Sequence, residues 1–355
     1  MNYTSLVEVL GWISDEVQGH VQPYLQDVWE IAAPYLLLLY DHLVTILLVI
    51  GINLPGILSE IDLDVISWCF WLFLPVLVVF ILPCMILLML YGTILFLHLY
   101  KARHSLKDAY TRSLWDGARL TVATFWEGHG KIWHGENYRY EIHGLENFPS
   151  EGPAVFCYYH GAIPVDFYYM MASIFIKKGR AMVVIGDRFM YYIPGFKLLL
   201  QVFNVTSGTI EECTEFLQEG NVVAVAPGGV REAFFSDSNY HLIWGNRVGF
   251  AKCAIEAKVP IIPVFTQNCR EGFRSLGLFK PFFAWLYEKT RLPVVPIYGG
   301  FPVKWRTYIG KPIPYQEGIS AKQLTSQTKE GIELLIKKHQ KIPGNILNAF
   351  LERFL

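Results

Sequence analysis

Residues 158–169 read Tyr158-Tyr159-His160-Gly161-Ala162-Ile163-Pro164-Val165-Asp166-Phe167-Tyr168-Tyr169 and directly follow the apolar run Ala154–Cys157. We expect a buried strand that ends near His160, a turn made by Gly161 and Pro164, and a buried helix from about Phe167. A strand that breaks and returns as a helix is how α/β proteins place reactive side chains at the ends of their strands. The stretch therefore predicts an α/β fold with His160 at its functional edge.

His160 and Asp166 have two interpretations. A histidine at a strand end can act as a general base, while an aspartate fixes its tautomer and stabilises the imidazolium. An isolated pair of this kind belongs more often to a helix-capping turn, with Asp166 near the start of the helix. The other motifs of the chain have to decide between the two.

From about residue 113 onward, short β-branched runs alternate with segments of helical pattern. Alternation of this kind predicts a mixed, largely parallel sheet flanked by helices, within a domain that spans residues 101–355. The expected strands are Val183–Ile185, Val222–Ala226, Ile261–Phe265 and Val294–Tyr298, and the expected helices are Thr209–Leu217, Asn246–Ala257 and Ala321–His339.

Charge is divided unevenly along the chain. Residues 1–100 contain no Lys or Arg and nine Asp or Glu, whereas the remaining residues hold all 30 bases and 22 acids, a net formal charge of +8. The basic part is suited to anionic lipid headgroups or an anionic cofactor. Neither an RNA-recognition motif nor a basic helix is found, so no nucleic-acid partner is expected.

Residues 65–100 contain no Asp, Glu, Lys or Arg. A continuous helix of that length would span roughly 54 Å, against about 30 Å for the hydrocarbon core of a bilayer. Pro75 and Pro83 should break or kink it, so we expect a transmembrane hairpin or one kinked span rather than a buried helix pair of a soluble protein. Basic residues follow at once and predict a cytosolic location for the C-terminal side: Lys101, Arg103, His104, Lys107 and Arg112.

Residues 1–64 form an acidic, apolar and interfacial segment in this interpretation, with no basic region typical of a signal peptide. Residues 31–59 are interrupted by Asp41 and by the turn signal Asn53–Gly56. They fit an imperfect span or a helix that lies on the membrane.

Several reaction classes are not expected. The six cysteines lack paired or metal-ligand spacing, which argues against disulfides and a metal site and favours a reducing, cytosol-facing compartment. There is no phosphate-binding P-loop, no dinucleotide fingerprint and no GxSxG, so neither a bound cofactor nor a nucleophilic serine is predicted.

Three further stretches follow expected strands. Pro227, Gly228 and Gly229 could cradle an oxyanion or phosphate, with Arg231 and Glu232 beside them, although such a sequence is more often a plain turn. Arg188 either binds acceptor or cofactor, or pairs with Asp187 at a helix start. The segment Arg270–Arg274 reads as a charged loop that meets headgroups or solvent.

The order of these motifs resembles that of the glycerolipid acyltransferase superfamily. The residues within the motifs resemble those of the transmembrane protein 68 family, over roughly residues 65–355. The resemblance rests on four stretches: Leu114–Arg119, Tyr159–Pro164, Pro227–Glu232 and Gly299–Lys304. It implies an enzyme of the endoplasmic reticulum membrane that is similar to diacylglycerol acyltransferases and takes its acyl group from acyl-CoA or a phospholipid. In it, His160 would deprotonate the acceptor hydroxyl and Asp166 would orient the imidazole, with membrane lipids as partners.

Two departures from the superfamily pattern matter. Five residues separate His160 from Asp166 where the superfamily has four, and a turn that contains Pro164 can absorb the extra one. The chain also has Pro-Gly-Gly-Val-Arg where phosphate-binding members have Pro-Glu-Gly-Thr-Arg, which favours a neutral acceptor: diacylglycerol, and ether-linked glycerolipids with it. The alternatives are a monoacylglycerol or lysophospholipid acceptor, or a lipid-binding protein without catalysis.

Overall fold

The computed structural model describes residues 34, 38, 42, 45, 63–104, 106, 112–134, 140–277 and 279–354. Apart from four helical positions, the predictions for residues 1–62 lie outside the described residues. The chain divides into two compact units, Met1–Pro75 and Val76–Leu355. The second unit contains the predicted acyltransferase domain and is the one described below.

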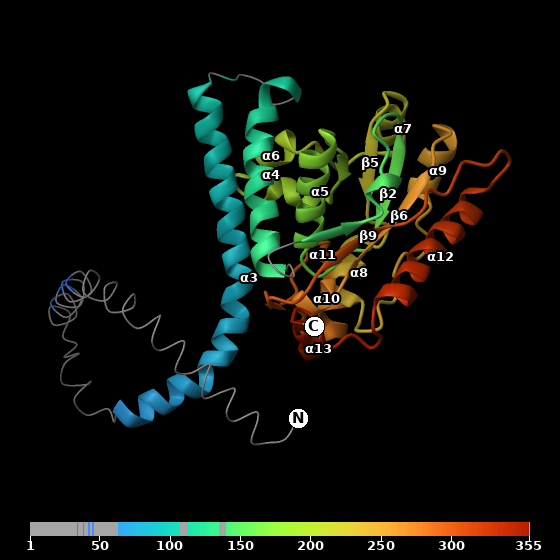
Figure 1. Ribbon diagram of the computed structural model, residues 1–355. Helices are drawn as coiled ribbons and strands as arrows, with labels where there is room; N and C mark the ends of the chain where they lie inside the picture. The colour runs from blue at the N-terminus through green and yellow to red at the C-terminus, as the bar shows by residue number, and fades with distance from the viewer. Residues whose placement is uncertain are drawn as a thin grey trace. The chain divides into compact units, whose positions relative to one another are not determined.

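A seven-stranded sheet lies at the centre of this unit (Figure 1), in the order β1-β9-β6-β2-β5-β3-β4. All neighbouring strands are parallel except β6 and β9. The strands are β1 Glu141–His143, β2 Ala154–Tyr158, β3 Val183–Ile185, β4 Val205–Thr206, β5 Val222–Val225, β6 Ile261–Gln267 and β9 Arg306–Ile309. This confirms the predicted α/β class with a mixed, largely parallel sheet.

Helices pack on both faces of the sheet. α5 covers one face and packs in turn against α4, while α7, α9 and α12 cover the other. The helices are α4 Arg112–His134, α5 Val165–Lys178, α6 Phe196–Val202, α7 Ile210–Gln218, α8 Gly229–Phe235, α9 Gly249–Glu256, α10 Cys269–Gly272, α11 Lys280–Thr290, α12 Ala321–His339 and α13 Ile346–Leu351, with the short 3₁₀ helices η1 Leu145–Asn147 and η2 Arg188–Tyr192.

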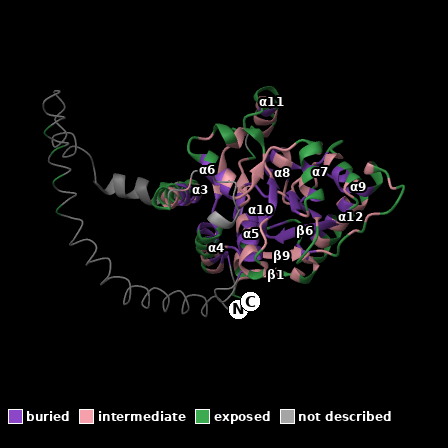
Figure 2. Ribbon diagram, turned by 90° about the horizontal axis from the view of Figure 1, so that it is seen from above, coloured by how far each residue is buried: buried purple, intermediate pink, exposed green. Residues whose placement is uncertain are grey.

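The central strand β2 shows why the sequence folds this way. Phe156 and Tyr158 pack on the α5 side, whereas Val155 and Cys157 pack on the side of α7, α9 and α12. Successive side chains of a strand point to opposite faces, and both faces here are covered, so the strand is a continuous apolar run. Figure 2 shows the buried residues concentrated in the strands and on the inner faces of the helices.

The predicted strand Val294–Tyr298 is wrong in position. The structure has β8 at Ile297–Gly299, paired only with β7 Phe273–Ser275 in a separate two-stranded sheet. Pro296 has no backbone N–H, so regular pairing begins only after it. The predicted helix Ala321–His339 has the same bounds as α12, because Ser320 and Gln323 form a capping box at its start.

The apolar segment before the domain forms α3, one helix from Leu63 to Arg103. Of the two predicted forms, the hairpin is therefore wrong. Pro75 and Pro83 do not end α3. A proline removes one backbone hydrogen bond from a helix and requires a local steric adjustment, and long apolar helices tolerate both. Among the described residues one helix is long and apolar enough to cross a membrane, over Phe80–Arg103.

From residue 76 onward, α3 has two distinct faces. Four residues at helical spacing pack into the core with α4 and α6: Ile86, Leu90, Ile94 and Leu97. The other face exposes apolar side chains, including Leu88, Leu95 and Leu99. A helix with an apolar exposed face is suited to contact with lipid, which supports membrane association.

Replacing Ile332 by alanine should destabilise the domain. Ile332 is fully buried between α12 and the sheet, so the change leaves a cavity and should cost about 2–5 kcal/mol of unfolding free energy. Leu334→Ala on the same helix is the control, because Leu334 is exposed and its truncation should change stability by about 0.5 kcal/mol or less. Chemical denaturation of the purified protein in detergent measures both, and equal losses would contradict the packing described here.

Candidate active site

His160 lies just beyond the carboxyl end of β2, in the turn that leads into α5. Its ring Nδ1 is 2.7 Å from the backbone carbonyl oxygen of Gly161. A carbonyl only accepts hydrogen bonds, so in the neutral ring Nδ1 carries the proton and Nε2 keeps the lone pair. The ring also lines a cavity. This is the tautomer that a general base needs.

Burial sets the protonation state of His160. It lowers the pKa of the imidazole, the hydrogen bond to Gly161 raises it in part, and the nearby charge of Arg270 lowers it further. The pKa therefore lies below its usual value of 6.5. Near neutral pH the ring is uncharged and able to accept a proton.

The backbone of His160 is held by Glu232. One carboxylate oxygen accepts the His160 N–H at 3.1 Å, and the other accepts the Ile243 N–H at 3.1 Å. Glu232 is fully buried in α8, and burial raises its pKa to about 7 against the opposing effect of these two N–H donors and of Arg270. Predicted as a substrate contact, Glu232 is placed by the structure behind the site, where it fixes the turn of His160.

The predicted Pro-Gly-Gly cradle follows β5 and is built around Glu232 and Arg247. A Cβ on Gly228 would overlap the Glu232 side chain, so only glycine fits there. Gly229 has a positive φ of 49°, which favours glycine. Arg247 donates hydrogen bonds to the carbonyl oxygens of Pro227 at 2.7 Å and Gly228 at 2.9 Å. These bonds hold the turn against the cavity wall, which includes both Gly229 and Arg247.

Asp166 lies at the start of α5 and is buried. Its carboxyl bonds to the Thr266 side chain, and Thr266 bonds onward to Thr307 at 2.8 Å. Between these described residues there is no hydrogen bond from the Asp166 carboxyl to the His160 ring. Helix α5 begins directly after Pro164. In its first turn Asp166 bonds to Thr266 of β6, while the His160 ring bonds to the Gly161 carbonyl. Its predicted role as the orienting group stays a prediction.

Arg231 and Arg188 lie apart from His160. The Arg231 guanidinium forms an ion pair of 2.7 Å with Glu288 of α11. Arg188 is exposed at the start of η2, where the Asp187 carboxylate caps the helix by accepting the Phe189 N–H. Neither arginine belongs to the cavity lining, and their roles as substrate contacts stay predictions.

The interpretation of Arg270–Arg274 as a headgroup-facing or solvated loop is wrong. Arg270 and Glu271 are almost completely buried. The Arg270 guanidinium donates hydrogen bonds to carbonyl oxygens at the end of α8, among them Glu232 at 3.2 Å and Ser236 at 2.9 Å. Glu271 accepts a hydrogen bond from Tyr240 and forms an ion pair with Arg274. The sequence predicted solvent exposure for these charged residues because the groups that bind them are distant in sequence.

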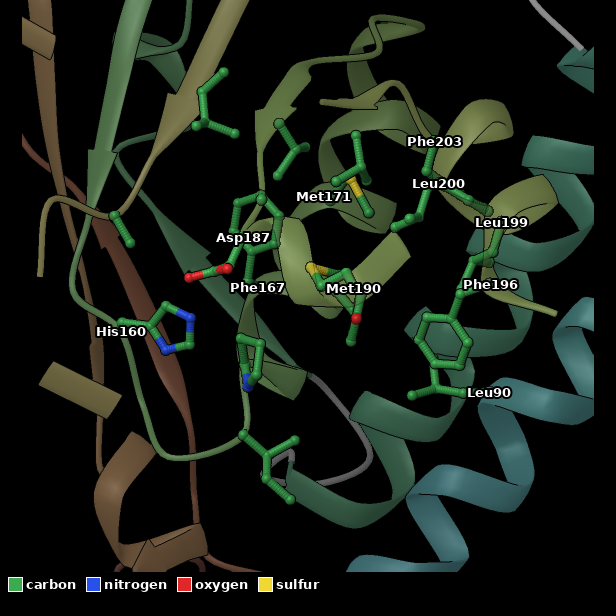
Figure 3. A pocket seen from close by; sticks show the side chains of 18 of the residues that line it. Leu90, His160, Phe167, Met171, Asp187, Met190, Phe196, Leu199, Leu200 and Phe203 are labelled. Atoms are coloured by element: carbon green, nitrogen blue, oxygen red, sulfur yellow. The ribbon is translucent and has the colours of Figure 1, made fainter. Parts of the chain in front are cut away.

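The cavity has a volume of about 620 Å³ and a mostly apolar lining. Figure 3 shows it extending from His160, past Phe167 and Met190, to Phe196 of α6 and Leu90 of α3. A pocket of this size can bury a ligand with a long apolar part. Since its wall ends at α3, the apolar space connects the strand edge that bears His160 with the helix that is suited to lipid contact.

Three charged residues of the cavity wall were not among the predicted sites: Arg119, Asp187 and Arg247. The sequence offered a signal for Asp187, since it follows β3 after a single glycine, Gly186, and stands beside Arg188. The sequence offered no such signal for Arg247. This residue lies in the loop before α9, distant in sequence from the Pro227 carbonyl to which it donates a hydrogen bond.

Comparison with known proteins identifies the class. A family model described as Acyltransferase matches residues 139–267, which include His160, Asp166 and Glu232. A crystal structure of the 1-acyl-sn-glycerophosphate acyltransferase PlsC from Thermotoga maritima is similar at a TM-score of 0.43 and 17% identity, over 76% of this chain and 93% of that chain. The protein is an acyltransferase.

Similar proteins identify the family within this class. Proteins named DGAT1/2-independent enzyme synthesizing storage lipids are 58% identical in Bos taurus (81% of this chain, 84% of that protein), 57% in Homo sapiens (81% and 87%) and 50% in Gallus gallus (80% and 84%). The chain belongs to this family, and the resemblance to the transmembrane protein 68 family is confirmed.

Replacing Asp166 by asparagine should change how stability depends on pH. Burial raises the pKa of the folded Asp166 from 3.8 to about 7, so between these pH values the folded state binds a proton that the unfolded state has released. Unfolding free energy should then fall as pH rises through this window, and Asp166→Asn should remove that contribution. Denaturation midpoints at several pH values measure it, with exposed Glu317→Gln as control. A wild-type slope in Asp166→Asn would contradict the buried, raised pKa.

Proposed function

We propose that the protein is a membrane-bound O-acyltransferase that esterifies a neutral glycerolipid, with diacylglycerol as acceptor and triacylglycerol as product, and that ether-linked glycerolipids are also acceptors. One observation carries the proposal: the neutral His160 ring, with Nδ1 on the Gly161 carbonyl, lines an apolar cavity of about 620 Å³. The names of the relatives, which refer to storage-lipid synthesis, support the same class of product.

In this mechanism Nε2 of His160 takes the proton of the acceptor hydroxyl while the hydroxyl oxygen attacks the acyl carbonyl carbon. The tetrahedral intermediate collapses, the bond from carbonyl carbon to the donor's leaving atom breaks, and the imidazolium returns the proton to that atom. The leaving group is the thiol of coenzyme A or the hydroxyl of a lysophospholipid. No acyl-enzyme is formed, and the Gly161 carbonyl stabilises Nδ1–H throughout.

The surroundings of the cavity support a neutral acceptor. The arginine of the Pro-Gly-Gly-Val-Arg stretch, Arg231, pairs with Glu288 outside the lining. Two arginines line the cavity, and both have partners in the protein. One guanidinium nitrogen of Arg247 donates to two backbone carbonyls, and Arg119 donates to the Val202 carbonyl at 2.7 Å and forms an ion pair with Asp116 at 3.2 Å. A phosphomonoester prefers several charge-assisted donors, whereas diacylglycerol requires only one site for its hydroxyl and apolar space for its chains.

We further propose that α3 anchors the enzyme in the membrane of the endoplasmic reticulum with the catalytic domain in the cytosol. The basic residues at the end of α3, Lys101 and Arg103, support this orientation because positive charge is retained on the cytosolic side.

Replacing His160 by alanine should lower acylation about 10²–10⁴-fold, since general-base catalysis is lost. The assay uses membranes from cells that lack other triacylglycerol-forming enzymes, supplied with labelled diacylglycerol with and without acyl-CoA. His143→Ala is a matched control, because His143 is about half exposed on β1. Product that needs added acyl-CoA identifies that donor, and product without it points to a phospholipid.

Two other outcomes of this assay would change the proposed function. A His160-dependent product from monoacylglycerol or a lysophospholipid, but none from diacylglycerol, would change the acceptor. No His160-dependent product from any of the three would leave a lipid-binding protein without catalysis.

The pH dependence of kcat/KM should also report His160. The base works in its neutral form, and burial holds its pKa below 6.5, so activity should persist in mild acid and fall only as pH drops through that lowered value. Initial rates in mixed micelles between pH 5 and pH 8, which bracket the usual titration range of histidine, measure the acid limb. An inflection above 6.5 would rule out a partly buried, neutral His160 as the base.

A further inference from the structure

Helix α11 exposes aromatic side chains where a helix in water would expose polar ones. Phe282 and Trp285 are 54% and 57% exposed, are three residues apart on one face, and their rings lie 6.1 Å from each other. Phe279 caps the helix and is 65% exposed, and Leu292 and Val294 just after it are also exposed. This patch is much larger than the single apolar residues that occur on most surfaces.

A second aromatic element lies beside α11. Tyr192 at the end of η2 is 82% exposed, and Tyr191 is also exposed. The two elements are joined underneath, because Phe189 of η2 packs on the buried cluster that contains Tyr287 of α11. We call the exposed side chains of Phe279, Phe282, Trp285, Tyr191, Tyr192 and Leu292 the aromatic rim.

The elements that bear the rim are also walls of the cavity. Phe189, Met190 and Ile193 of the η2 region line it, as do Pro293 and Ile297 after α11. At another part of its wall the cavity is lined by Leu87 and Leu90 of α3. Figure 2 shows α3 and α6 at the left of the domain, α11 at its top and α12 at its right. Apolar surface therefore borders the cavity on two sides, at the rim and at α3.

Basic residues surround the rim. Lys289 and Arg291 are exposed at the end of α11, Lys280 lies at its start, and Arg188 is exposed on η2. Two acidic residues lie among them: Glu288, which is paired with both Arg231 and Arg291, and Asp187, which caps η2. Aromatic side chains flanked by Lys and Arg are typical of the boundary between headgroups and acyl chains, and positive charge favours anionic lipids.

We propose that the aromatic rim docks into the surface of an anionic bilayer, so that the cavity opens into lipid between the rim and α3. A bilayer fits better than a protein partner, because the rim is continuous through the cavity wall with the helix that is suited to lipid contact. Only the identity of the molecules that enter the cavity rests on the proposed function; the docking itself does not.

The test places a photoreactive phenylalanine analogue at Phe282 in the full-length protein, reconstituted in phosphatidylcholine vesicles with and without phosphatidylserine. A matched site is Leu334, which is 59% exposed on α12. After illumination, position 282 should give several-fold more lipid adduct than position 334, and more with phosphatidylserine present. Equal lipid adducts at the two positions, or mainly a protein adduct at 282, would overturn the proposal.

A second variant gives an independent readout. Phe282→Ser combined with Trp285→Ser should keep the wild-type denaturation midpoint, since both side chains are exposed. It should lower triacylglycerol synthesis from diacylglycerol in vesicles several-fold while leaving synthesis in detergent mixed micelles at the wild-type rate. Wild-type rates in vesicles would contradict docking. If no acylation occurs at all, the proposed function fails and the lipid adducts still decide the docking.

Discussion

The Glu232 carboxylate accepts hydrogen bonds from two backbone N–H groups, one in the turn after β2 and one in the loop before α9. Burying a carboxylate is costly unless its oxygens are bonded, and here each has an N–H donor, with the Arg270 guanidinium nearby. Without Glu232, two buried N–H groups would lose their partners. The position of His160 therefore depends on a side chain that does not itself line the cavity.

This arrangement explains why so many charged motif residues face away from the substrate space. Glu232 fixes the turn of His160, Arg270 caps the end of α8, and Arg247 holds the carbonyls of the Pro-Gly-Gly turn. Each charge thus stabilises backbone that a glycine-rich and proline-rich turn could not hold alone. The cavity wall is left mostly apolar, which suits a substrate made chiefly of hydrocarbon.

Local pattern predicted the elements that depend on near neighbours. The strand before His160, the helix after it and the capped helix α12 all follow from residues within a few positions of each other. Features that depend on distant partners could not be predicted. Nothing near Arg270 in sequence reveals the α8 carbonyls that bury it, and nothing near Asp166 reveals Thr266. Of the break or kink predicted at Pro75 and Pro83, the break is wrong, since α3 continues through both prolines. A proline ends a helix less readily in an apolar helix than in water.

The Gly161 carbonyl has a chemical consequence for the proposed base. A carboxylate on Nδ1 would raise the pKa of the imidazole and stabilise the imidazolium strongly, whereas a neutral carbonyl raises it only in part and burial dominates. His160 is then a weaker base, with a pKa below that of an ordinary histidine, and near neutral pH its resting ring is uncharged. In an apolar cavity this is an advantage, because a resting imidazolium would be an unpaired charge. Charge needs to exist on the ring only while the proton moves from the acceptor hydroxyl to the leaving group, and the carbonyl dipole is already oriented to stabilise it.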